Sequence, residues 1–237
     1  MKKRFLSLLL TLVMILGMIP ATALTASAVF LLFAILFFAP VEIPHKITLT
    51  VGSAFIASLW LCPWQISLAL LFSALGDYFG SCHNFLAQMG TFAVAHVFYA
   101  YYFINRWLTK VEADRKMTSK AKGMAFLMLM MIIALLVFIF IKVVPCAPEG
   151  IIRNGVCIYA LLICTMFYFA LMQRSSLFAL GAVLFVFSDF ILAWNKFVEP
   201  IEHSRILIMT TYYLAQYLLF IRSTPYRVKN GLRLFRF

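Results

Sequence analysis

The stretch GMAFLMLMMIIALLVFIFIKV at residues 123–143 decides the fold class, because the 18 residues from Met124 to Ile141 carry no charge. A helix that crosses a bilayer needs about 20 apolar residues in a row. A strand of a membrane barrel needs about ten, with strict alternation of apolar and polar side chains. The stretch is long and continuously apolar, so it predicts a transmembrane helix.

The composition of the whole chain agrees with a membrane protein. Of the 237 residues, 65% are hydrophobic and 12% are charged, and the mean hydropathy is +1.00, whereas soluble domains carry about 25% charged residues. The net charge of +12 does not indicate nucleic acid, because the basic residues stand between and after apolar segments. The five cysteines contain no C-x-x-C pair and show no metal or redox motif, so we predict no cofactor. A metal held by Asp77, His83, His96 and Asp189 is a minor alternative, because no ligand spacing supports it.

Proline, glycine and charged residues divide the chain into eight apolar segments, near 24–40, 47–62, 64–80, 85–105, 123–143, 155–173, 177–195 and 204–221. The predicted fold is therefore all-α, a polytopic bundle of about eight transmembrane helices over residues 24–222. Short loops leave no room for a separate soluble domain. We expect a multi-pass protein of the cell membrane, and no oligomeric state is predicted.

The charges between the segments predict the orientation, because Lys and Arg accumulate on the cytoplasmic side. The expected loop after the fourth segment and the tail at 223–237 are both basic, and an even number of helices puts them on one side. Both ends of the eight-helix core are then cytoplasmic. Four glutamates fall on the other side, in loops with few bases: Glu42, Glu149, Glu199 and Glu202.

The first 23 residues read as a signal-like or extra hydrophobic segment. Lys2, Lys3 and Arg4 precede an apolar run, and Ala26-Ser27-Ala28 resembles a cleavage site. Three interpretations stay open: a cleaved signal with an inverted core, an uncleaved extra segment, or a long broken first helix.

Three ionisable side chains fall inside the apolar segments, and they are the candidate catalytic residues: Asp77, Asp189 and His96. A charged side chain at the bilayer centre costs at least about 2.5 kcal/mol, so such residues usually face the bundle interior and mark a functional path. We therefore expect the three to converge in one cavity.

Helical spacing adds polar neighbours, because residues three or four apart share one face of a helix. The candidate substrate-binding residues are Ser73, Tyr99, Asn195, Tyr212 and Gln216. The alternative is that these side chains only join helices through hydrogen bonds, which is common in membrane bundles.

Four motifs in order resemble the YhhN family of membrane proteins, which includes the animal lysoplasmalogenases. They are FSALGDYF (72–79), FLAQMGTFAVAHVFY (85–99), GAVLFVFSDFILAWNKF (181–197) and TTYYLAQYL (210–218), and the resemblance runs from about residue 24 to 222. It implies hydrolysis of the vinyl ether bond of lysoplasmalogens, with a lysophospholipid substrate drawn from the membrane lipids.

The residues suit that chemistry, because vinyl ether hydrolysis begins with protonation of an alkenyl carbon by an acid. A pair of carboxyl groups can supply the proton and stabilise the resulting cation, as in glycosidases. Asp77 and Asp189 are the candidates, His96 would orient the water or hold one acid, and Tyr212 would donate to the hemiacetal oxygen. The alternative function is a proton-coupled transporter or a lipid-binding membrane protein, although the broken helices typical of many transporters are missing from the pattern.

Overall fold

The computed structural model describes residues 21–114 and 119–224, and this part of the chain is helical without strands. Its α-helices are α2 (Ala21–Phe38), α3 (Lys46–Leu61), α4 (Trp64–Ser81), α5 (Phe85–Asp114), α6 (Ser119–Lys142), α7 (Ile151–Leu171), α8 (Ser176–Phe197) and α9 (Ser204–Ser223), with a 3-10 turn, η1 (Val144–Cys146), after α6. Each predicted apolar segment corresponds to one helix, so the all-α fold class is confirmed.

The largest difference from the predicted boundaries is at α5, which has 30 residues and continues to Asp114. The prediction of a basic loop directly after residue 105 is wrong for the first part of that loop. Residues 106–114 contain neither glycine nor proline and include several good helix formers, so nothing ends the helix where the apolar segment ends. Arg106 and Lys110 therefore lie on α5, and Lys120 and Lys122 lie on α6.

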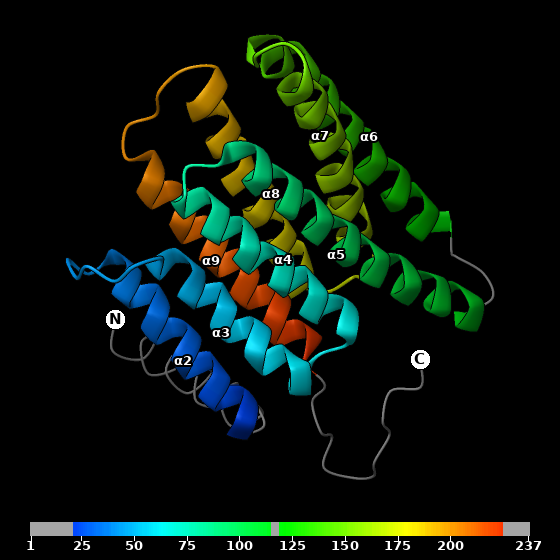
Figure 1. The fold of residues 1–237 in the computed structure, drawn as a ribbon. Coiled ribbons are helices and arrows are strands. Elements are labelled where there is room, and N and C mark those ends of the chain that lie inside the picture. Colours follow the sequence, from blue (N-terminus) through cyan, green and yellow to red (C-terminus); the bar gives the residue numbers. More distant parts are fainter. Residues whose placement is uncertain (1–20, 115–118, 225–237) are drawn as a thin grey trace, which may run out of the picture.

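The helices run up and down with roughly parallel axes, and both the start of α2 and the end of α9 lie at the same end of the bundle (Figure 1). The end of α5 and the start of α6 lie there too, and we call this the basic end. The four glutamates that were expected together lie at the opposite end, in the turns after α2, η1 and α8. We call that end the glutamate end.

The glutamate end carries more basic residues than the sequences of its loops alone suggested. Its cations stand in the first or last turns of helices: Lys46, Lys142, Arg153, Lys196 and Arg205. Two of them are engaged locally, since Arg153 pairs with Glu149 at 3.0 Å and Lys46 donates to the carbonyl oxygens of Ala39 and Val41.

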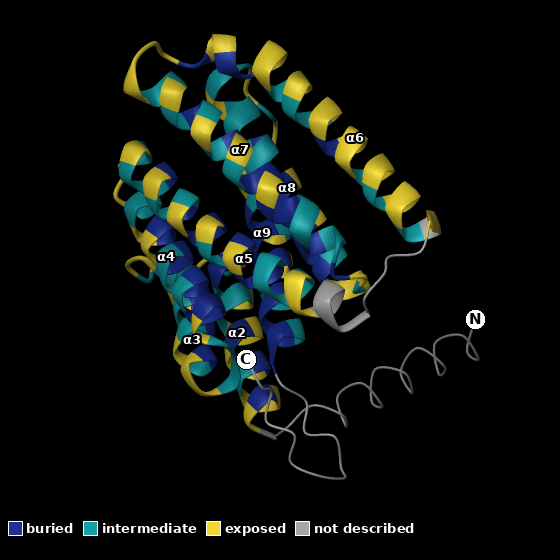
Figure 2. Ribbon diagram, turned by 90° about the vertical axis from the view of Figure 1, so that its right-hand side faces the viewer, coloured by how far each residue is buried: buried dark blue, intermediate teal, exposed yellow. Residues whose placement is uncertain are grey.

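Helix α6 lies at the outside of the bundle and is exposed along most of its length (Figure 2). Its exposed side chains are large and apolar, among them Phe126, Leu127 and Ile141. Three helical segments are long and apolar enough to cross a membrane, at Ala121–Cys146, Ile151–Leu171 and Ser176–Phe197. An apolar surface of this size requires lipid as its solvent, so the chain is a membrane protein.

Helix α2 runs through the Ala26-Ser27-Ala28 sequence and packs against the bundle. Ser27 and Phe30 are buried, and the Phe30 ring lies 5.6 Å from the ring of Tyr217 on α9. The remainder of the signal-like segment, residues 1–20, and nearly all of the predicted basic tail, residues 225–237, lie outside the described residues.

Candidate functional site

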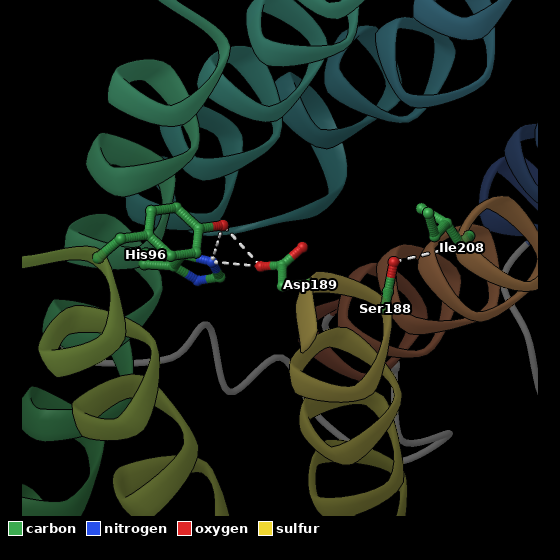
Figure 3. A network of polar contacts seen from close by, with 5 residues as sticks. His96, Ser188, Asp189 and Ile208 are labelled. Carbon is green, nitrogen blue, oxygen red and sulfur yellow. Dashed lines mark hydrogen bonds and ion pairs between the residues drawn. The ribbon is translucent and has the colours of Figure 1, made fainter. Parts of the chain in front are cut away.

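His96 and Asp189, which Figure 3 labels, form a polar cluster with Tyr159 between three helices, α5, α8 and α7. The Tyr159 hydroxyl donates to Oδ2 of Asp189 at 2.6 Å. Nε2 of His96 lies 3.0 Å from the Tyr159 hydroxyl and 3.3 Å from the same Oδ2. One carboxylate oxygen therefore has two partners, and Oδ1 is left for other contacts.

The surroundings hold the cluster in place. His96 is fully buried, and its ring packs edge-on against Phe185 at 4.7 Å. Next to Asp189, the hydroxyl of Ser188 donates to the backbone oxygen of Ile208 at 3.0 Å, which fixes α8 against α9 (Figure 3). The Asp189 side chain keeps 14% of its surface exposed. Asp189 is thus positioned by its neighbours and still accessible.

The exposed part of Asp189 faces a cavity between α5, α7 and α8 with about 430 Å³ of empty space, including the part open to the outside. Asp189, Tyr159 and Gln88 contribute polar groups to its wall, and the rest of the wall is apolar: Phe85, Met89, Phe92, Val156, Leu192, Ala193 and Phe197. Phe85 begins α5 and Phe197 ends α8, so the cavity extends from mid-helix to the glutamate end. A cavity with an apolar wall and a few polar groups suits an amphiphilic ligand.

Asp77 belongs to a different cluster. It is buried on α4 and accepts a hydrogen bond of 3.1 Å from the Tyr212 hydroxyl on α9. The Phe185 ring contacts both His96 at 4.7 Å and Tyr212 at 5.6 Å, so it lies between the two clusters. Asp77 does not line the cavity that Asp189 lines. The structure thus brings two of the three predicted catalytic residues into contact, and the convergence of Asp77 with them stays a prediction.

The predicted substrate-binding residues also lie outside the wall of this cavity. Tyr99 and Gln216 are fully buried and bonded to each other, with the Tyr99 hydroxyl 2.6 Å from Oε1 of Gln216. Ser73 is buried and lies four residues before Asp77 on α4. Its hydroxyl has no hydrogen-bond partner within the described part of the chain. Asn195 accepts a hydrogen bond of 2.8 Å from the backbone of Ile201, so it holds the turn that follows α8.

Tyr159 is the residue of the cluster that was not predicted from the sequence. It lies near the start of an apolar segment, where tyrosine is usually read as an interfacial anchor. Its distance from both ends of α7 was a usable signal, because a tyrosine hydroxyl that is buried away from water needs a hydrogen-bond partner. Which partner it finds depends on the packing of α5, α7 and α8, and no local pattern reveals that.

The fold and this cluster define a helical membrane protein with a carboxyl group set in an apolar cavity. The chain belongs to the YhhN family, whose model matches residues 44–223, from just before α3 to the end of α9. The match begins later than the resemblance at residue 24 suggested, and α2 lies outside it.

The chain is similar to curated proteins of mammals that carry the name lysoplasmalogenase. It is 34% identical over 155 residues to lysoplasmalogenase TMEM86B of Sus scrofa, covering 64% of this chain and 59% of that protein. It is 31% identical over 178 residues to lysoplasmalogenase TMEM86A of Bos taurus, covering 69% of this chain and 66% of that protein. The chain thus spans about three fifths of the length of the first of these relatives. No solved structure matches it significantly.

Proposed function

We propose that this chain is a multi-pass protein of the cell membrane that hydrolyses the vinyl ether bond of lysoplasmalogens. All eight helices cross the bilayer in this proposal, and the exposed face of α6 meets lipid. The observation that carries the function is the carboxyl group of Asp189 in the wall of an apolar cavity. The names of the similar mammalian proteins supply the substrate class.

The reaction starts when an acid transfers a proton to the carbon of the vinyl ether double bond that is not bonded to oxygen. The electrons of the double bond form the new C–H bond, and the adjacent C–O unit becomes an oxocarbenium ion. Water adds to this cation and loses a proton, which gives a hemiacetal. The hemiacetal breaks its bond to the glycerol oxygen, which is released as an alcohol, and leaves a fatty aldehyde.

Asp189 is the proton donor in this scheme, because it is the carboxyl group that lines the cavity. The proton sits on Oδ1 before transfer, since Oδ2 already accepts from Tyr159. After transfer, the hydrogen bond from Tyr159 and the contact with His96 stabilise the carboxylate, and hydrogen bonds to charged groups are the stronger ones. The same carboxylate then lies beside the cation and can take the proton of the attacking water.

His96 and Tyr159 act as positioning residues through Asp189, with distances of 3.3 Å and 2.6 Å to its Oδ2. Asp77 acts indirectly in this proposal, through its contact with Tyr212. Its partner Tyr212 packs edge-on against Phe92 at 5.7 Å, and Phe92 is part of the cavity wall. The Asp77–Tyr212 pair would thus influence the shape of the cavity wall through Phe92.

The experiment that tests this function is aldehyde release by the purified protein in detergent, with a lysoplasmalogen and its saturated ether analogue as substrates. We expect aldehyde from the lysoplasmalogen alone. Asp189→Asn should lose activity by at least about 10², because general acid catalysis contributes that much. Heavy water should slow the wild type about two-fold or more, as expected for rate-limiting proton transfer. No aldehyde from well-folded wild-type protein would reject the hydrolase and favour a transporter or a lipid-binding protein.

A further inference from the structure

The positively charged ammonium group of Lys196 lies at the edge of the cavity that Asp189 lines. Its Nζ lies 4.4 Å from the centre of the Phe85 ring, and Phe85 forms part of the cavity wall. Phe85 packs edge-on against Phe197, which is the next residue after Lys196 and also lines the cavity. The ammonium group is thus attached to the wall at the glutamate end.

The position of Lys196 on α8 relates it directly to the carboxyl group. Asp189 and Lys196 are seven residues apart, which is two helical turns, so both lie on nearly the same face of α8. The rise of about 1.5 Å per residue separates their Cα atoms by about 10 Å along the axis. A ligand that lies along this face therefore meets the carboxyl group at one point and the cation about two turns further on.

The charge of Lys196 has no acidic partner within the described residues, because the ion pairs found there involve His96, Arg153 and His203. Lys196 is exposed, and its ammonium group lies over the face of Phe85. Arg153, at the same end of the bundle, is paired with Glu149 and with backbone oxygens of the 145–147 turn. Lys196 is therefore free to take an anion from the ligand.

The turn after α8 keeps Lys196 in place. Trp194 donates to Glu199 at 3.0 Å, and Asn195 accepts from the backbone of Ile201 at 2.8 Å. The two residues directly before Lys196 are thus tied to the segment that follows the helix. A cation held in this way loses less conformational freedom on binding than a lysine on a mobile loop.

We propose that Lys196 binds the phosphate of a single-chain glycerophospholipid whose ether linkage lies at Asp189. Lysine is a common phosphate ligand because its ammonium group is a compact point charge. The three-carbon glycerol backbone and the lysine side chain together bridge the two turns between the residues. The inference rests on the proposed function for the identity of the ether, whereas the phosphate contact is an independent property of the cavity.

A binding measurement tests the contact without any turnover. The probes are a saturated alkyl ether lysophospholipid, the matching alkylglycerol without phosphate, and inorganic phosphate, each added to purified protein while its melting temperature is measured. We expect the lysophospholipid to stabilise the wild type more than the alkylglycerol does, and inorganic phosphate to have no effect. Lys196→Ala should remove the difference between the two lipids. Equal stabilisation by both lipids in the wild type, or stabilisation by inorganic phosphate alone, would overturn the proposal.

Kinetics give the second readout and a matched control. Lys196→Ala should raise the KM for lysoplasmalogen by up to about five-fold, the equivalent of one exposed charge contact. It should leave turnover of the phosphate-free alkenylglycerol unchanged, and Lys196→Arg should retain most of the affinity. Lys142→Ala is the control, because Lys142 is an exposed lysine at the same end of the bundle that does not touch the cavity wall. Equal effects of Lys142→Ala and Lys196→Ala would show a general surface charge effect and reject the site.

The two hypotheses fail in different ways. A wild type that releases no aldehyde but prefers the phosphate lipid through Lys196 would reject the hydrolase and keep the phosphate site. A wild type that cleaves lysoplasmalogen and alkenylglycerol alike, with no effect of Lys196→Ala, would keep the hydrolase and reject the phosphate site.

Discussion

The hydroxyl of Tyr159 on α7 donates a 2.6 Å hydrogen bond to Oδ2 of Asp189 on α8. Both residues line the cavity, and the same hydroxyl lies 3.0 Å from Nε2 of His96. The carboxyl group is therefore oriented by a residue from a different helix of the cavity wall. If Asp189 donates the proton, this hydrogen bond becomes stronger as the carboxylate forms, so it favours the transition state over the ground state.

We predict that Tyr159→Phe lowers kcat by about ten-fold to a hundred-fold, whereas its melting temperature falls only by what one lost hydrogen bond explains and the variant stays folded at the assay temperature. The ring still fills its place, and only the hydrogen bond to the carboxylate is lost, which is worth about 1.5–3 kcal/mol for a charged acceptor. Tyr168→Phe is the control, because Tyr168 lies on the same helix and does not line the cavity. A kcat for Tyr159→Phe within two-fold of the wild type would remove Tyr159 from the mechanism.

Asp189 and His96 were predictable from the sequence because the cost of burying an ionisable group is a property of the residue and its segment. The partners were not predictable in this way. Tyr159 meets Asp189 only because α7 packs between α5 and α8, and this is a feature of the tertiary structure. Asn195 was chosen for its spacing from Asp189, and the structure shows that it stands near the end of α8 and accepts a hydrogen bond from the following turn, so its part in substrate binding stays a prediction.

The eight described helices were predictable because continuous apolar segments separated by charges and prolines locate their ends to within four residues, except at the end of α5. Charge marks the expected membrane boundary, however, and not the end of a helix. This is why α5 continues to Asp114 beyond its apolar segment. The same distinction explains the bases of the glutamate end, which lie in helical turns and were overlooked in a count of loops.

We predict that Gly76→Ala destabilises the protein and narrows the cavity. A Cβ atom at Gly76 would lie 2.7 Å from two ring atoms of Phe92, a ring that also packs against Tyr212 and lines the cavity. Overpacking of this kind costs about 1–3 kcal/mol. The melting temperature and the activity should therefore both fall.

Gly90→Ala is the matched control for this substitution, because a Cβ atom there meets nothing within 4 Å. It should be neutral or slightly stabilising, since alanine favours a helix more than glycine does. Equal melting temperatures for the two alanine variants and the wild type would show that Phe92 has room to move, contrary to the packing described above.

We predict that the glutamate end faces the outside of the cell. Cys82 and Cys146 are exposed and follow α4 and α6 at that end. A membrane-impermeant maleimide added to intact cells should therefore label the wild type through these two thiols, and labelling should be lost in the Cys82→Ser/Cys146→Ser double variant. Gly123→Cys in this double variant reports on the basic end, because Gly123 is exposed at the start of α6. Labelling of Gly123→Cys in intact cells would show that the orientation is reversed.

The last prediction separates Asp77 from Asp189. Tyr212 donates to Asp77 at 3.1 Å, and the cavity wall includes Phe92 but not Asp77. Asparagine at position 77 keeps an oxygen that can accept this hydrogen bond, so we expect Asp77→Asn to fold normally and to retain more than about a tenth of the activity, well above the loss of at least about 10² expected for a general acid. Tyr212→Phe removes the donor and leaves a buried carboxyl group without its partner, which should cost about 1–3 kcal/mol of stability. A double-mutant cycle of Asp77→Asn and Tyr212→Phe on melting free energies measures how strongly the two side chains are coupled. Loss of activity by 10² or more in Asp77→Asn, at an unchanged melting temperature, would instead give Asp77 the direct role in proton transfer that its place in an apolar segment first suggested.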